Sequence, residues 1–180
     1  MNNLPLFFLI YFSVFNNLGA IFNFDWDKYY YEIVSYHNIL REKHGVPPLT
    51  TDPKLEKYAQ ETAIDSLYIG SFKRGESYRN GEYLGQNLYI GMGNPYTGRY
   101  LTNYWYSENA YYNYYSGKSQ NGDIINHFTQ MIWKTTQKIG CGYTVGRWKT
   151  YAEGYYICCY YSPGGNLPGL YVKNVPRPKN

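Results

Sequence analysis

The sequence lacks the short motifs that mark common hydrolases. It contains neither G-x-S-x-G, the turn that presents a nucleophilic serine, nor H-E-x-x-H, the helical pair of histidines that binds catalytic zinc. It also lacks an Asn-x-Ser/Thr sequon, so N-glycosylation is not expected. No break in composition divides its 180 residues, and this length suits one domain with a substantial core.

Charged side chains are absent from residues 1–20. An apolar run from Leu4 to Phe15 is followed by the small pair Gly19 and Ala20, as in a secretory signal peptide, although no Lys or Arg precedes the run. The alternative is a short N-terminal anchor, but the run is too short to span a bilayer. We therefore predict a signal peptide over 1–20, a secreted extracellular protein, and no transmembrane segment.

Clusters of like charge are also absent. The formal net charge is +4, and the basic residues are scattered along the chain before a short basic tail over 177–180. Scattered charge is typical of a solvated surface rather than of a nucleic-acid groove. Nucleic acid is therefore not an expected partner, and we expect a monomer.

Tyrosine, in contrast, is abundant, with 25 residues that include the run Tyr29-Tyr30-Tyr31. One interpretation is an aggregating low-complexity tract. The tyrosines are interleaved with helix and turn signals, however, which favours amphipathic side chains shared between core and surface.

The spacing of apolar residues predicts helices alternating with a few strands. Asp52 suits a cap and Pro53 the first position of a helix, and Leu101, Trp105, Glu108 and Tyr112 recur at helical spacing, which places Glu108 in line with an aromatic helix face. We expect helices over 27–44, 53–70, from 97 onward and over 123–134, and strands over 84–90, 138–145 and 151–161, the last two joined as a hairpin. The pattern predicts an α+β domain.

Four segments, in the same order, resemble the CAP superfamily of cysteine-rich secretory, antigen 5 and pathogenesis-related 1 proteins. They are His37-Asn38-Ile39-Leu40-Arg41, Gly85-Gln86-Asn87-Leu88, His127-Phe128-Thr129-Gln130-Met131-Ile132-Trp133 with Ile139-Gly140-Cys141-Gly142, and Cys159-Tyr160-Tyr161-Ser162-Pro163-Gly164-Gly165-Asn166. The resemblance implies a three-layer α-β-α sandwich with a small antiparallel sheet between helices, over a domain of residues 27–176. It also implies a single-domain member without the Cys-rich extension of venom and sperm relatives.

The resemblance further implies a cleft that, in many family members, holds a divalent metal between two histidines and two glutamates. Glu108 and His127 match two of these positions, Gln86 stands where the family has its other Glu, and Phe72 is nearest in register to the missing His. We assign these four residues to the cleft as ligand-binding candidates. His37, Asn38, Arg41, Gln130 and Trp133 are expected to be scaffold.

The substitution of Gln86 has a chemical consequence. Zinc takes three or four ligands from His, Cys and carboxylate, and a neutral amide neither replaces a carboxylate well nor accepts a proton. We therefore expect no cofactor and no catalytic residue, with Glu108 and His127 as the two weak candidates for zinc. The competing interpretation is that these two side chains hydrogen-bond to each other or to Gln86 in a structural pocket.

Three cysteines cannot all pair within one chain. The resemblance implies a disulfide between Cys141 and Cys159. Neighbouring strand residues point to opposite faces, so only one of Cys158 and Cys159 can meet Cys141. Cys158 is then expected to be a buried free thiol, with pairing between chains as the alternative.

Two classes of function follow. The first is a non-enzymatic secreted protein that binds a sterol, a fatty acid or an extracellular protein, with the Gly- and Tyr-containing loop over 91–96 as a contact for an apolar ligand. The second is a metal-dependent hydrolase or protease that uses Glu108 and His127. Signalling through the surface is a third option.

Overall fold

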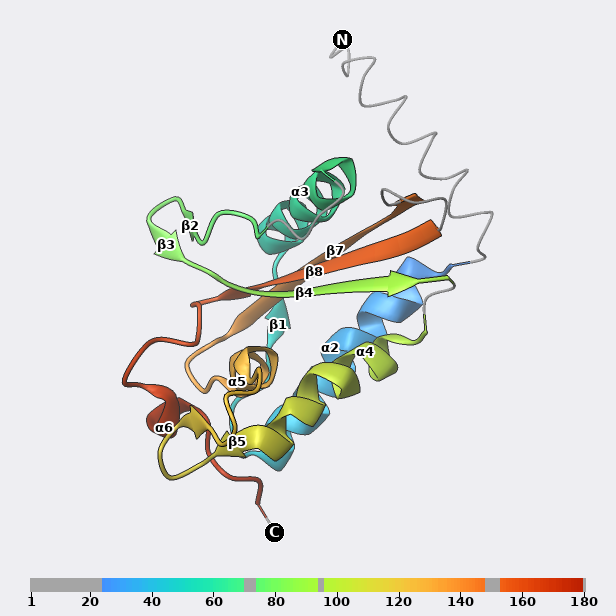
Figure 1. Ribbon diagram of the computed structural model, residues 1–180. Coiled ribbons are helices and arrows are strands. Elements are labelled where there is room, and N and C mark those ends of the chain that lie inside the picture. The colour runs from blue at the N-terminus through green and yellow to red at the C-terminus, as the bar shows by residue number, and fades with distance from the viewer. Residues whose placement is uncertain (1–23, 70–73, 94–95, 148–152, 180) are drawn as a thin grey trace.

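A four-stranded sheet lies between two helical layers in the computed structural model, which describes residues 24–69, 74–93, 96–147 and 153–179 (Figure 1). The predicted signal peptide lies outside the described residues. The helices are α2 (Trp26–Lys43), α3 (Pro53–Ile69), α4 (Gly98–Tyr106), the 3-10 helix η1 (Ser107–Tyr111), α5 (Asn126–Ile132) and α6 (Tyr171–Asn174). The strands are β1 (Thr50–Thr51), β2 (Tyr78–Arg79), β3 (Glu82–Tyr83), β4 (Gly85–Met92), β5 (Tyr112–Asn113), β6 (Lys118–Ser119), β7 (Lys138–Arg147) and β8 (Glu153–Ser162).

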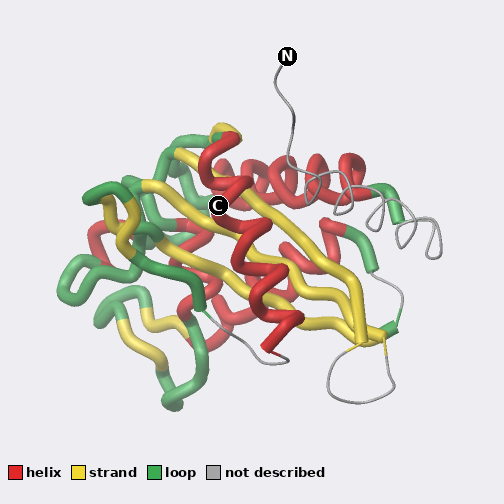
Figure 2. The backbone as a smooth tube through the Cα atoms, turned by 90° about the horizontal axis from the view of Figure 1, so that it is seen from above, coloured by secondary structure: helices red, strands yellow, loops and turns green. Residues whose placement is uncertain are grey.

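The order of strands in the central sheet is β1-β7-β8-β4. The long strands β4, β7 and β8 are antiparallel, whereas the short β1 pairs parallel to β7. Helix α3 covers one face and α2, α4 and α5 lie on the other, and the view from above shows a helix lying across the strands (Figure 2). The three-layer α-β-α sandwich is therefore confirmed, with a mixed sheet in place of a purely antiparallel one.

Two glycines allow α3 to approach β7 closely. A Cβ on Gly140 would lie 2.3 Å from the backbone nitrogen of Glu56, and one on Gly142 would lie 2.3 Å from that of Gln60. Side chains at either position would push the helix off the sheet. Cys141, between them, points to the opposite face and joins the larger core cluster.

The first two helices begin and end where the sequence signals predict. The Asp25 carboxylate caps α2 by accepting a hydrogen bond from the Lys28 backbone N–H at 3.0 Å, and Gly45 follows the helix with φ +65°. Pro53 opens α3.

The third helix is shorter than its apolar spacing predicts. Helix α4 ends at Tyr106, and Glu108 lies in the 3-10 turn η1 rather than on the helix, while Tyr112 belongs to β5. The Ser107 hydroxyl donates to the Tyr104 carbonyl at 2.7 Å, which satisfies a carbonyl at the end of the helix. Trp105 is fully buried and anchors the last turn of α4.

Within the described residues, no helix is long and apolar enough to cross a membrane.

Candidate functional site

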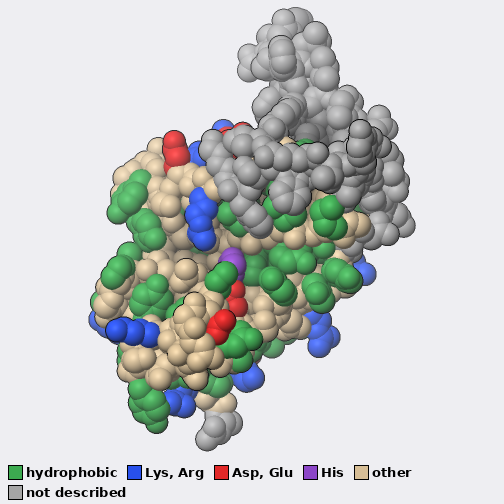
Figure 3. Space-filling view, viewed as in Figure 1, with side chains coloured by type: hydrophobic (Ala, Val, Ile, Leu, Met, Phe, Trp, Pro, Cys, Tyr) green, Lys and Arg blue, Asp and Glu red, His purple; other side chains and the backbone are tan. Residues whose placement is uncertain are grey.

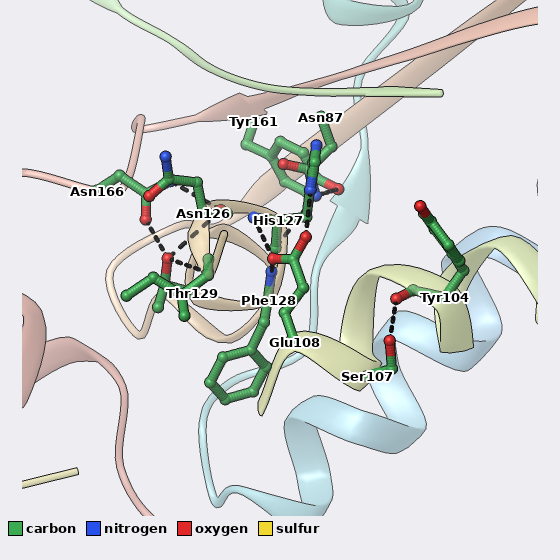
Figure 4. A network of polar contacts seen from close by, with 11 residues as sticks. Asn87, Tyr104, Ser107, Glu108, Asn126, His127, Phe128, Thr129, Tyr161 and Asn166 are labelled. Carbon is green, nitrogen blue, oxygen red and sulfur yellow. Dashed lines mark hydrogen bonds and ion pairs between the residues drawn. The ribbon is translucent and has the colours of Figure 1, made fainter. Parts of the chain in front are cut away.

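The carboxylate of Glu108 caps the N-terminus of α5. Its Oε2 accepts hydrogen bonds from the backbone N–H groups of His127 at 2.9 Å and Phe128 at 3.1 Å, and its Oε1 lies 2.6 Å from His127 Nδ1 (Figure 4). The residue before the helix, Ile125, has no side chain that could cap it. A negative charge from η1 therefore satisfies backbone donors that would otherwise be unpaired, and it also faces the positive end of the helix dipole.

His127 is held from three directions. Its ring stacks on Trp105, with centroids 5.9 Å apart and an angle of 14° between the planes. Its backbone carbonyl accepts from the Asn87 side-chain amide at 3.2 Å. Since a carboxylate only accepts, neutral His127 donates from Nδ1 to Glu108, which leaves Nε2 as the acceptor of the ring. The side chain is 21% exposed, and because His37 and His44 are buried, the histidine that reaches the surface is His127.

A buried chain of hydrogen bonds runs behind this pair. The Asn87 amide donates to the Tyr161 hydroxyl at 3.2 Å, and that hydroxyl lies 2.9 Å from His37 Nε2. His37 Nδ1 donates to the Ile33 carbonyl at 2.8 Å, so Nε2 accepts from Tyr161. Burial lowers the pKa of His37 to about 4, which keeps the ring neutral in this chain.

The other scaffold candidates tie loops to helices. Arg41 is fully buried and donates to the carbonyls of Pro47, Met131, Trp133 and Thr136 at 2.7 to 3.0 Å. Burial lowers the pKa of its guanidinium to about 10.

The remaining three scaffold residues also stabilise the fold through hydrogen bonds or core packing. Asn38 exchanges two hydrogen bonds with the backbone of Leu49. Gln130 accepts from the Gly165 N–H at 2.8 Å, and Trp133 is buried in the core. None of these side chains reaches the surface beside His127.

Asn166 also supports α5, and residue types alone did not single it out. Its Oδ1 accepts from the Thr129 hydroxyl at 2.6 Å and its amide donates to the Asn126 carbonyl at 2.9 Å (Figure 4). Its φ of 61° lies in the left-handed region, which Asn tolerates better than most residues. The Gly-Gly-Asn ending of the closing motif was the available signal.

Cys141 and Cys159 form a disulfide across β7 and β8, where they are direct register partners. This is the pairing that the resemblance implied. Cys158 is a buried free cysteine on the α3 side of the sheet, among Leu55, Ala59 and Tyr160. Burial raises the pKa of its thiol well above the usual value.

The order of these motifs agrees with a known family. The model of the CAP family, the cysteine-rich secretory protein family, matches residues 34–161.

The chain belongs to the CAP family.

Relatives and solved structures agree with this assignment. The chain is 35% identical over 158 residues to Secreted protein RBT4 of Candida albicans, an alignment that covers 82% of this chain and 40% of that protein. It is 31% identical over 154 residues to Golgi-associated plant pathogenesis-related protein 1 of Homo sapiens, covering 84% and 95% of the two chains. The structure of venom allergen-like protein 4 of Schistosoma mansoni matches with a TM-score of 0.60 and 27% identity, over 82% of this chain and 93% of that one.

The first listed relatives are longer proteins, and the chain spans only 40 to 50% of their length.

The CAP cleft implied by the resemblance is only partly assembled among the described residues. Glu108 and His127 meet, but Gln86 lies on the α3 side of β4, because its neighbour Asn87 uses the opposite face to reach His127. Gln86 donates instead to the Gly75 carbonyl at 2.9 Å, and the structure describes no hydrogen bond between Gln86 and either cleft residue. Of the two hydrogen bonds that the sequence left open for this pair, to each other or to Gln86, the structure shows the first. Phe72 lies outside the described residues.

This donor set does not fit a divalent metal. Within the described ranges, no three His, Cys, Asp or Glu side chains are grouped as metal ligands. Both oxygens of Glu108 already accept hydrogen bonds, and three donors converge on them. The open positions of the pair are Nε2 of His127 and one lone pair on Oε1 of Glu108, fewer than the three or four ligands that a zinc site takes.

Proposed function

We propose that this CAP protein is a secreted, non-enzymatic binding protein whose partner is an extracellular protein. The observation that supports this proposal is the commitment of Glu108: a carboxylate that caps a helix and holds His127 is not free to serve as a general base. Relatives that are named as secreted or pathogenesis-related proteins support the extracellular setting.

The surface that we assign to binding is an exposed tyrosine stripe, defined as Tyr96, Tyr100 and Tyr104. Tyr100 and Tyr104 are four residues apart and so lie on one side of α4, while Tyr96, just before the helix, contacts the Tyr100 ring, and each tyrosine is between 44% and 61% exposed. Tyr104 packs edge-on against Tyr89 of β4, with ring centroids 5.4 Å apart. Hydrophobic side chains, tyrosines included, gather beside the histidine on this face (Figure 3).

The chemistry of this stripe suits a protein surface. Tyrosine offers a large apolar ring and a polar hydroxyl at low cost in side-chain entropy, and for this reason it is enriched in protein interfaces. Each tyrosine of the stripe is 44% to 61% exposed in the described part of the chain, whereas a sterol or a fatty acid is usually buried over most of its surface. A sterol site is therefore the second candidate, supported by the exposed apolar side chain of Met92 at the end of β4.

The test compares two double variants. Tyr100→Ser with Tyr104→Ser removes the stripe, and Tyr31→Ser with Tyr111→Ser is the matched control, since both control residues are exposed and lie outside the stripe. Each immobilised protein is exposed to extracellular fluid from its source, and a retained protein is then purified and titrated directly. We expect one partner to bind wild type and control but not the stripe variant.

Two further measurements separate the alternatives. Saturable binding of a fluorescent sterol or fatty acid that is lost in the stripe variant would replace the protein partner with a lipid. Turnover of a peptide or ester substrate that is lost in His127→Ala would contradict the non-enzymatic proposal altogether.

A further inference from the structure

Tyr96 and Tyr100 form an exposed pair of phenols whose rings are close together and tilted to one another. Their ring centroids are 4.4 Å apart, with an angle of 32° between the planes, and the rings are 61% and 44% exposed. The Thr97 side chain fixes this arrangement, because its hydroxyl oxygen caps α4 by accepting from the Tyr100 backbone N–H at 3.0 Å. The cap turns the chain so that residues on either side of it share one face.

Other tyrosine pairs in the described residues are farther apart or less accessible. The ring centroids of Tyr112 and Tyr114 are 4.9 Å apart, but Tyr112 is buried. Those of Tyr89 and Tyr155 are 6.0 Å apart, and Tyr155 is buried. Tyr78 and Tyr83 are 5.4 Å apart, as are Tyr89 and Tyr104. The pair at the start of α4 therefore combines the shortest separation with access for both rings.

We infer that Tyr96 and Tyr100 are a site of oxidative coupling, in which a haem peroxidase using hydrogen peroxide joins the two rings as dityrosine. This inference is independent of the proposed binding role.

The reaction balances with one peroxide for each link. Each phenol gives up one electron and one proton, and the two electrons and two protons reduce hydrogen peroxide to two waters. The two phenoxyl radicals form a carbon–carbon bond next to their oxygens. The two ring C–H bonds at that position then break, and their protons restore the phenolic O–H groups. The chain loses two hydrogen atoms in total.

The environment of the pair favours this product. The free thiol of Cys158, which would otherwise reduce a tyrosyl radical, is fully buried on the α3 side of the sheet. The two rings are already in contact within one chain, so the second radical meets its partner without diffusion. Exposed tyrosines without a close partner, such as Tyr111, lack this advantage.

The test treats the purified protein with horseradish peroxidase and hydrogen peroxide and follows dityrosine fluorescence. Trypsin cuts after Arg99, between the two tyrosines, so an internal link joins two peptides, 80–99 and 100–118, with a combined mass lower by two hydrogen atoms. Fragmentation then places the link. We expect Tyr96–Tyr100 as the main product in a chain that stays monomeric.

Three variants make the result decisive. Tyr96→Phe and Tyr100→Phe keep the rings and the fold but should abolish the linked peptides, whereas Tyr111→Phe, equally exposed at 44%, should leave them unchanged. Circular dichroism checks that each variant is folded. Absence of the link in wild type, or links mainly between chains through Tyr31 or Tyr115 that persist in Tyr96→Phe, would overturn the inference.

Discussion

Oε1 of Glu108 lies 2.6 Å from Nδ1 of His127, while the other oxygen of the same carboxylate accepts hydrogen bonds from the backbone N–H groups of His127 and Phe128 in the first turn of α5. A single side chain from η1 thus fixes the position of a helix and the orientation of an imidazole. These two residues match half of the family's metal cleft, yet their geometry serves the packing of α4 and η1 against α5.

Arg41→Lys should destabilise the protein by about 3 kcal/mol, because a lysine ammonium cannot reach the four carbonyls that the guanidinium joins, and buried carbonyls would lose their donors. Urea unfolding measures the change. Arg99→Lys is the control, since Arg99 is exposed and stacks on Tyr36. Equal free energies of unfolding for the two variants would show that the hydrogen bonds of Arg41 do not stabilise the fold.

Stability should fall as the pH decreases from about 6.5 to about 4. Burial lowers the pKa of His37 from 6.5 to about 4, so in this window the unfolded chain binds a proton that the folded chain excludes. The loss amounts to about 3 kcal/mol over the full window.

Urea unfolding at several pH values tests this dependence. His37→Gln should reduce the slope without abolishing it, because burial also lowers the pKa of His44. An unchanged slope in the variant would mean that other groups cause the dependence.

Removing the disulfide by Cys141→Ala with Cys159→Ala should cost about 3 kcal/mol, because the bridge closes a loop with a sequence separation of 18 residues. Cys158→Ala should cost only about 1 kcal/mol, the effect of a small cavity in the α3 cluster. Thermal unfolding under non-reducing conditions compares the variants. A larger loss of stability in Cys158→Ala than in the double variant would contradict the pairing of Cys141 with Cys159.

Zinc titration by calorimetry should give weak heats without saturation at one ion per chain, because Glu108 and His127 offer too few metal-ligating atoms. His127→Ala should leave these heats unchanged. Tight one-to-one binding that is lost in this variant would show a metal site.

Much of the fold could be predicted from local signals. Periodicity, the start signal of Pro53 and the stop signal of Gly45 located α2 and α3, whereas the Asp25 cap of α2 was not predicted. The end of α4 could not be predicted, because the apolar spacing continues past Tyr106 to Tyr112 while the backbone tightens into η1. A tertiary contact accompanies this change: from η1, the Glu108 carboxylate accepts a hydrogen bond from the backbone N–H of His127 in α5, 19 residues later in the chain.

The candidate site could be predicted only in part. Family motifs brought Glu108 and His127 together correctly. The same motifs placed Gln86 beside them, although the alternation of a strand already indicated that Gln86 and Asn87 face opposite sides. The residue of that motif that contacts His127 is Asn87. The tyrosine stripe could not be predicted, because the exposure of each tyrosine depends on how the chain packs.

The free energy of unfolding of Glu108→Gln tests directly whether Glu108 is a structural cap of α5. The substitution would remove the negative charge, and the NH2 group of the new amide would face N–H donors of His127 and Phe128. We therefore expect the free energy of unfolding, measured with urea, to fall by about 2 kcal/mol. For the exposed control Glu76→Gln it should change by no more than about 0.5 kcal/mol. A Glu108→Gln protein as stable as wild type, or more stable, would contradict the account, because catalytic carboxylates are commonly held at a cost in stability and structural caps are not.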